Sequence, residues 1–282
     1  MYIDQGIPTI DSYRELLKSN LFRSMETFSS QFLKKNKKAL QEYSRKWVID
    51  PLHQWSRQYE YPFVYFHVRD YINNQQKSDL KILDAGSGVT FFPYYLCSNS
   101  QKIKVYCCDY DLTHGQIFYN INKNLNLPNN FFPADIRRLP FGTSTFDIVY
   151  CISVLEHTDD YDIIIQEFKR ILKPNGLFIV TFDISIDGID DIPREKAVEL
   201  IESLEKHFFC TNGFNSKQAL DLIDSEKILT TQYIRELDKN LLPWKYSCSN
   251  ALKDLLRLRA PKRFFTNLTC FCLALSKKKW CS

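Results

Sequence analysis

Residues 82–88, Ile-Leu-Asp-Ala-Gly-Ser-Gly, decide the fold class of this chain. Their apolar start predicts a buried strand, which reaches an acid at Asp84 and then breaks into a turn. Gly86 and Gly88 permit positive φ in that turn and let a ligand approach bare backbone. The stretch therefore predicts a strand that leads through a ligand-binding turn into a helix.

A second apolar run, residues 103–109, also ends in an acid, Asp109. In α/β folds that bind nucleosides, a carboxylate at the end of the second strand accepts hydrogen bonds from the ribose hydroxyls. The two runs together predict a nucleoside-containing ligand that lies across the carboxyl ends of two parallel strands.

The glycine turn does not fit a dinucleotide, because Phe91 occupies the third glycine position of G-x-G-x-x-G. It resembles instead motif I of the class I S-adenosylmethionine methyltransferases, D-x-G-x-G-x-G. Asp84, Gly86 and Gly88 match that motif, whereas Thr90 stands where its last glycine usually lies. S-adenosylmethionine has no phosphates, so a turn without dinucleotide spacing can still hold its aminocarboxypropyl arm. A turn that binds no ligand is the alternative interpretation of this segment alone.

Further segments complete a resemblance to the methyltransferase type-11 pattern, from about residue 80 to 182. They are Asp135-Ile136, Leu-Pro-Phe at 139–141, Phe-Asp-Ile-Val at 146–149, and Ser-Val-Leu-Glu-His at 153–157. The resemblance implies an α/β fold with a doubly wound, mostly parallel, seven-stranded sheet, the Rossmann-like methyltransferase fold. It also implies S-adenosylmethionine as the cofactor.

The resemblance assigns roles to the acids and glycines. Asp84 would orient the glycine loop and reach the methionine amino group, and Gly86 and Gly88 would present backbone to the cofactor. Asp109 would bind the ribose hydroxyls. Asp111 is a rival for that role, with a capping function as its alternative.

The other cofactor residues implied by the resemblance lie around the adenine and the methyl group. Tyr110 would pack on the adenine. Asp135 would accept a hydrogen bond from the exocyclic amine of adenine, and Ile136 would cover the ring. Cys151 would end the fourth strand, where the backbone lines the path of the methyl group.

His157 is the candidate general base, because its pKa class suits proton transfer near neutral pH. A hydrogen bond to the backbone at the strand-to-helix turn is its alternative role, and His67 and Asp183 are weaker candidates for the base. Glu156 and Asp residues 159, 160 and 162 suggest a metal site. Helix capping explains at least Asp159 and Asp160, so no metal is expected.

The flanks divide the chain into four predicted parts: an N-terminal helical lid (1–77), the cofactor-binding core (78–183), a helical acceptor-pocket insertion (184–260), and a final strand with a tail (261–282). The strand that precedes the last one is expected near Trp244. An aromatic segment, 54–67, is similar to S-R-x-[W/Y]-E-Y-P in some bacterial methyltransferases. Its Arg57 would pair with the carboxylate of the cofactor, with plain helix packing as the alternative.

The composition adds little that is specific. The formal charge of the 282 residues is +4, and the nine cysteines show no repeated C-x-x-C spacing, which favours buried thiols in a reducing cytoplasm. Nothing resembles a signal peptide or an apolar run long enough to span a membrane. The basic clusters at 34–38 and 277–279 would attract a phosphorylated acceptor or form ordinary solvated surface.

These features predict a soluble cytoplasmic methyltransferase that acts on oxygen or nitrogen of a small metabolite or of a glycan or phosphorylated precursor. An RNA, DNA or protein acceptor is disfavoured: residues 151–154, Cys-Ile-Ser-Val, stand where base-amine methylation uses N/D-P-P-Y. No appended nucleic-acid module is visible. A non-catalytic partner protein that keeps the fold is the alternative from another class. The acceptor and the oligomeric state are not specified by the sequence.

Overall fold

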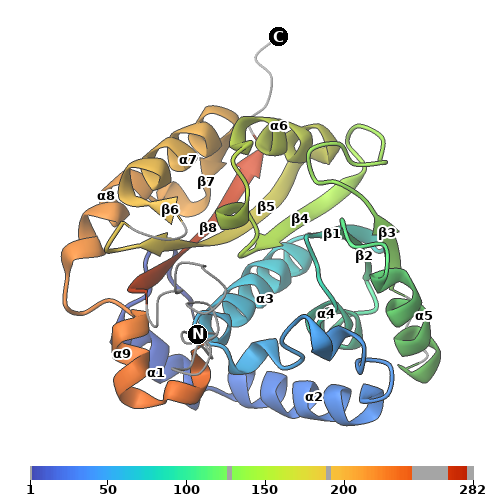
Figure 1. Cartoon of the computed structure of the whole chain (residues 1–282). Coiled ribbons are helices and arrows are strands. Elements are labelled where there is room, and N and C mark those ends of the chain that lie inside the picture. Colours follow the sequence, from blue (N-terminus) through green and yellow to red (C-terminus); the bar gives the residue numbers. More distant parts are fainter. Residues whose placement is uncertain (1, 126–128, 189–191, 243–265, 278–282) are drawn as a thin grey trace, which may run out of the picture.

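An eight-stranded sheet runs through the middle of the molecule, between two layers of helices (Figure 1). The computed structural model describes residues 2–125, 129–188, 192–242 and 266–277. The strands follow one another in the order β3 (Asn130–Pro133), β2 (Ile103–Asp109), β1 (Leu80–Ala85), β4 (Phe146–Ile152), β5 (Leu172–Ser185), β8 (Leu268–Lys277) and β7 (Phe208–Cys210). A short additional strand, β6 (Ile192–Pro193), pairs with β5 outside this path.

The five neighbouring strands β3, β2, β1, β4 and β5 pair in parallel. Strand β8 pairs antiparallel with both β5 and β7. The predicted doubly wound, mostly parallel sheet is thereby confirmed, with β6 as an eighth strand that the sequence did not indicate. The chain moves outward from β1 to β3 and then returns to β4 on the other side of β1. Ligands of open α/β sheets bind at such a reversal, outside the carboxyl ends of the strands.

The central strands are buried on both faces, which explains their continuous apolar runs. In β4, Ile148 and Tyr150 join the core on one face of the sheet, and Val149 and Cys151 join the core on the other. This alternation follows from the two-residue period of a strand. The end of β4 is therefore held in place by packing from both sides.

Helices of the N-terminal half cover one face of the sheet, and helices of the C-terminal half cover the other (Figure 1). The first group comprises α1 (Ile10–Lys18), α2 (Asn20–Asn36), α3 (Arg57–Asn73), α4 (Phe92–Asn99) and α5 (His114–Leu125). The second comprises α6 (Tyr161–Ile171), α7 (Arg194–His207) and α8 (Ser216–Leu220). Helix α9 (Thr231–Leu237) contacts β8.

Helix α3 brings the aromatic segment of the N-terminal region onto the sheet. It packs against β4, β5 and β8, and most of its residues are buried. Buried rings in this helix include Tyr59, Tyr61 and Phe63. The start of α3 therefore lies close to the carboxyl ends of the central strands, where the candidate site is found.

The region after β5 is less purely helical than the sequence suggested. Helix α7 packs against α6 and β5, and β7 lies beside β8, so both belong to the layers of the core. The strand expected near Trp244 falls outside the described residues, and the strand that the structure places beside β8 is β7. The last strand, Leu268–Lys277, lies within the segment 261–282 predicted for it. No helix among the described residues is long and apolar enough to cross a membrane.

Candidate functional site

The glycine loop follows β1 and closes tightly against two neighbouring segments. Gly86 has φ +76°, and a Cβ there would lie 2.5 Å from Val154 Cγ2. Gly88 has φ +51°, and a Cβ there would lie 2.7 Å from the hydroxyl of Tyr43. Both positions therefore require glycine for backbone conformation and for space.

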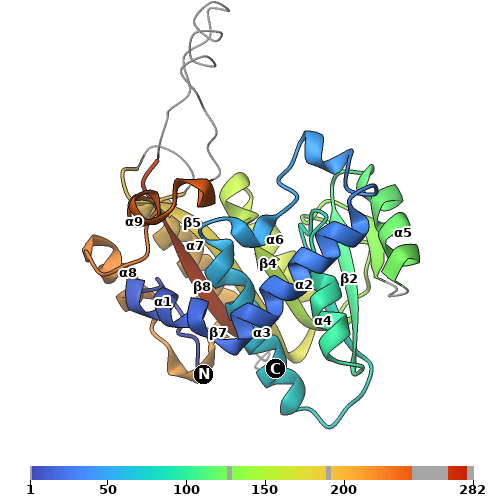
Figure 2. The same ribbon diagram turned by 90° about the horizontal axis from the view of Figure 1, so that it is seen from below.

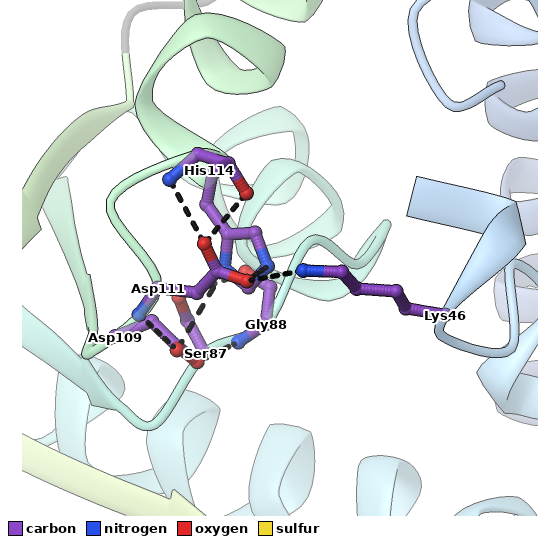
Figure 3. Close-up of polar contacts among 7 residues, drawn as sticks. Lys46, Ser87, Gly88, Asp109, Asp111 and His114 are labelled. Atoms are coloured by element: carbon purple, nitrogen blue, oxygen red, sulfur yellow. Dashed lines mark hydrogen bonds and ion pairs between the residues drawn. The ribbon is translucent and has the colours of Figure 1, made fainter. Parts of the chain in front are cut away.

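The carboxylate of Asp109 joins the end of β2 to the glycine loop (Figure 3). The backbone N–H of Gly88 donates to Oδ2 at 2.9 Å, and the N–H of Asp111 donates to Oδ1 at 3.1 Å. Asp109 is buried, so these two bonds fix its orientation in a poorly hydrated place. The loop and the acid that the sequence predicted separately thus form one unit.

His114 lies beside this unit and was not predicted from the sequence (Figure 3). Its Nδ1 is 3.7 Å from Asp109 Oδ1, and its Nε2 is 3.7 Å from Asp111 Oδ2. Burial lowers the pKa of His114 despite the two carboxylates, so the ring is neutral near pH 7. The sequence around His114 does not predict its place beside the two carboxylates, because that contact depends on how α5 packs after β2.

Asp84, one residue before the end of β1, is a buried carboxyl group. Burial raises its pKa to about 8, and the nearby charge of Asp109 adds to the shift. The group therefore holds a proton near neutral pH until a cation approaches. A buried acid of this kind suits a ligand that carries an ammonium group.

A second cluster ties α3 to the segment after β4. The guanidinium of Arg57 donates to Glu60, Ser56 and Ser153, and the hydroxyl of Ser153 donates to Glu60 Oε1 at 2.8 Å. Glu60 is fully buried. Burial opposes the charge of Arg57, but the Glu60 carboxylate raises the pKa of the guanidinium, which stays charged.

Ser153 holds an unusual backbone conformation in this cluster, with φ +45°. Its N–H donates to the carbonyl of Thr181 at 2.9 Å, which ties it to β5. Positive φ in a non-glycine residue is costly and persists where the surroundings over-determine it. The Arg57–Glu60–Ser153 cluster and the β5 contact supply that constraint.

Two tyrosines of the N-terminal region cover the glycine loop. The Tyr61 ring stacks on Phe92 with centroids 4.8 Å apart, and the charges of both Arg57 and Asp84 act on it. The Tyr43 ring meets His114 edge-on at 5.3 Å, and burial raises its pKa to about 12. Tyr43 was missed because its position above Gly88 depends on the path of the chain between α2 and α3.

The other predicted residues are more dispersed. Asp111 accepts from Thr113 N at 2.9 Å and from Thr113 Oγ1 at 2.6 Å, which fits its alternative role as a cap before α5. The Tyr110 side chain is exposed. Asp135, also exposed, binds the guanidinium of Arg137, which lowers the pKa of its carboxyl group.

Ile136, Cys151 and His157 occupy three different environments. Ile136 is half-buried against the core on the α6–α7 face. Cys151 is fully buried in that core, one residue before β4 ends. His157 is exposed in a short 3₁₀ turn (Leu155–His157), and its N–H donates to the Val154 carbonyl at 3.1 Å. The weaker base candidate His67 is buried, which lowers its pKa to about 4.

The structure thus brings Asp84, Gly86, Gly88 and Asp109 together. The Arg57 cluster adjoins them through Val154, the neighbour of Ser153, which lies against Gly86. Among the described residues, no group of three or more His, Cys, Asp or Glu side chains has the arrangement of a metal site. The assembled groups are two buried acids, a glycine loop and an aromatic cover.

Residues 83–180 match the profile of a family described as the methyltransferase domain. This part of the chain is a class I methyltransferase domain. The matched part runs from within β1 to within β5 and contains the glycine loop and both acids, so the predicted family is confirmed.

Curated relatives match parts of this chain. An uncharacterised Methanocaldococcus jannaschii protein is 37% identical over 106 residues, 38% of this chain and 42% of its own length. A tRNA U34 carboxymethyltransferase of Ruthia magnifica is 26% identical, with coverage of 63% and 56%. A sterol 24-C-methyltransferase of Schizosaccharomyces pombe is 30% identical, with coverage of 45% and 34%. The chain thus spans about a third to just over half of these relatives.

Among solved structures, a Pyrococcus horikoshii OT3 protein covers 84% of this chain and 99% of its own length, with 16% identity and a TM-score of 0.49.

Proposed function

We propose that this methyltransferase moves the methyl group of S-adenosylmethionine to an oxygen or nitrogen of a small acceptor, a metabolite or a glycan or phosphorylated precursor. The observation that carries the proposal is the Asp109 carboxylate, which two backbone N–H groups fix beside the glycine loop. Its remaining lone pairs are available to ribose hydroxyls.

We assign contacts to this cofactor along its whole length. The buried carboxyl group of Asp84 would bind the methionine ammonium. The positive charge of the ammonium would favour release of the proton from Asp84. Gly86 and Gly88 would allow close approach of the arm, and Arg57 would face its carboxylate. Tyr110, Asp135 and Ile136 would surround the adenine, and the backbone at Cys151 would line the path of the methyl group.

The bound cofactor supplies an electrophilic methyl group on a sulfonium. This chain then has to align the acceptor atom with the methyl and the sulfur and to exclude water. In this transfer the acceptor lone pair would form the new bond to the methyl carbon, and the electron pair of the carbon–sulfur bond would return to sulfur. His157, at its exposed turn after β4, is our candidate to receive the acceptor proton.

The acceptor pocket is proposed between the N-terminal lid (1–77) and the insertion (184–260), around the core (78–183) and the final strand (261–282). We further propose a cytoplasmic location, because the cysteines of the described segments are free thiols. Two relatives are a tRNA carboxymethyltransferase and a sterol methyltransferase, so tRNA and sterols should also be tested as acceptors.

Calorimetric titration with S-adenosylmethionine and with S-adenosylhomocysteine tests the cofactor step. We expect micromolar binding or better, about −8 kcal/mol or stronger, for the wild-type chain. Asp109→Ala should weaken both ligands, while its thermal unfolding stays cooperative.

Acceptors are then screened with isotopically labelled methyl donor, and the His157→Ala variant tests the base. Absence of binding in a folded protein would contradict the proposal and favour the non-catalytic partner protein.

A further inference from the structure

The chain that connects α2 to α3 carries an unusual combination of charge and apolar exposure. Residues 34–49 contain six cations and one carboxylate. This positive excess is larger than the +4 of the whole chain, so the other residues are on balance slightly negative. This short segment therefore carries a marked local excess of positive charge.

The end of this segment projects into solvent with apolar side chains. Residues 44–49 are all exposed, and Trp47 and Val48 each keep 46% of their surface accessible. Ile49 keeps 38%. Isolated exposed apolar residues are ordinary, but three consecutive ones beside a basic run are a feature of interaction surfaces.

A second loop adds to the same surface. Lys46 Nζ lies 3.8 Å from Asp111 Oδ2, so the segment meets the loop between β2 and α5 (Figure 3). The residues on either side of Asp111, Tyr110 and Leu112, are each 74% exposed. Figure 2 shows the α2–α3 connection at the edge of the molecule on the side of α5. We call the apolar side chains Trp47, Val48, Ile49 and Leu112, with the cations Lys34, Lys35, Lys37, Lys38, Arg45 and Lys46, the basic–apolar edge.

We propose that the basic–apolar edge docks the protein on an anionic lipid bilayer. Lysine and arginine clusters are attracted to anionic headgroups, and each contributes roughly 1 kcal/mol near such a surface. Tryptophan and aliphatic side chains enter the boundary between headgroups and acyl chains. The charge and the apolar tip thus act on the same partner.

This chemistry distinguishes a bilayer from other polyanions. RNA would engage the lysines, but it offers no apolar phase for Val48, Ile49 and Leu112. A small phosphorylated ligand would need a concave site, whereas residues 44–49 are exposed without interruption. The inference does not depend on the proposed methyl transfer, because it concerns a surface outside the glycine loop.

The test is co-sedimentation of the full chain with phosphatidylcholine vesicles, with and without phosphatidylglycerol. We expect binding only to the anionic vesicles, and binding that weakens with salt. Replacing Trp47, Val48 and Ile49 together by Ser should lower the partition coefficient at least about tenfold. Changing Lys34, Lys35, Lys37 and Lys38 together to Gln should give a similar loss.

A matched control uses exposed apolar residues elsewhere: Ile163, Leu222 and Leu237, also changed to Ser. This variant should partition like wild type, and all variants should keep the thermal transition of the parent. Trp47→Phe keeps an apolar ring, so it should retain binding and abolish the vesicle-induced shift in tryptophan emission. Two results would overturn the proposal: unchanged partition of the triple Ser variant, or binding to polyadenylate with none to anionic vesicles.

Discussion

The glycine loop with Asp109 and the Arg57–Glu60–Ser153 cluster lie close together but are built in opposite ways. The first unit comes from short motifs at the ends of two adjacent strands, joined by hydrogen bonds from backbone N–H groups to the Asp109 carboxylate. The second joins α3 to the segment after β4 through buried side chains. A unit formed by short motifs at strand ends can be recognised in the sequence. A cluster formed by side chains of distant segments is recognised only in the folded structure.

The largest stability effect is expected in the cluster. Glu60→Ala would leave Arg57 without its buried carboxylate, and losing one partner of a buried pair costs about 3–5 kcal/mol. The exposed pair Arg194–Asp224 is the matched control, where Asp224→Ala should cost less than about 1 kcal/mol. Urea unfolding of both variants measures the difference. Equal losses would mean that the cluster does not hold α3 in place.

The contact between the two regions is tested at Gly88. Gly88→Ala should destabilise the protein by about 1–2 kcal/mol from its positive φ, plus the clash with the Tyr43 hydroxyl. Gly213→Ala measures the φ strain alone, because φ is +66° there and nothing lies within 4 Å of the new Cβ. Tyr43→Phe in the Gly88→Ala background should recover the steric part. If urea unfolding shows no recovery of the free energy of unfolding, Tyr43 does not pack against the glycine loop at Gly88.

A smaller effect is expected in the pH dependence of stability. The folded protein keeps a proton on Asp84 up to about pH 8, whereas the ordinary pKa of the carboxyl is 3.8. The folded state therefore binds more protons in this interval, and its contribution makes the free energy of unfolding fall as pH rises from about 4 to 8.

Asp84→Asn should remove that fall, which is at least about 1.4 kcal/mol if the shift exceeds one unit. His114 acts in the opposite direction: its lowered pKa makes stability rise with pH below 6.5. His114→Gln is therefore the control and should steepen the fall. Thermal unfolding of both variants across this pH range provides the measurement, and an unchanged slope in Asp84→Asn would contradict the buried, protonated acid.

The fold could be predicted from the sequence because its central strands are local patterns. Buried parallel strands give continuous apolar runs, and the acids and glycines at their ends mark the edge where ligands bind. Strand β7 was missed because three residues, Phe208–Cys210, are too short to show a strand period. It is recognised only by its pairing with β8.

The candidate site was predicted in part for the same reason. Asp84 and Asp109 stand at strand ends, where sequence position determines spatial position. Tyr43, His114 and Ser153 take their places from contacts between distant segments, such as the hydrogen bond from Arg57 to Ser153, 96 residues apart. No local pattern encodes such a contact, and its detection requires the folded chain.

The central claim is that Asp109, and not Asp111, is the acid that holds the ribose. Both are acids beside β2 and both lie near His114, so they form a matched pair. Calorimetry should show that Asp109→Asn weakens S-adenosylhomocysteine binding about 100-fold, the cost of losing charged hydrogen bonds to two hydroxyls. Asp111→Asn should change the affinity for S-adenosylhomocysteine less than about threefold, because the Asp111 carboxylate accepts hydrogen bonds from Thr113. The reverse order of losses, or equal losses, would contradict the account.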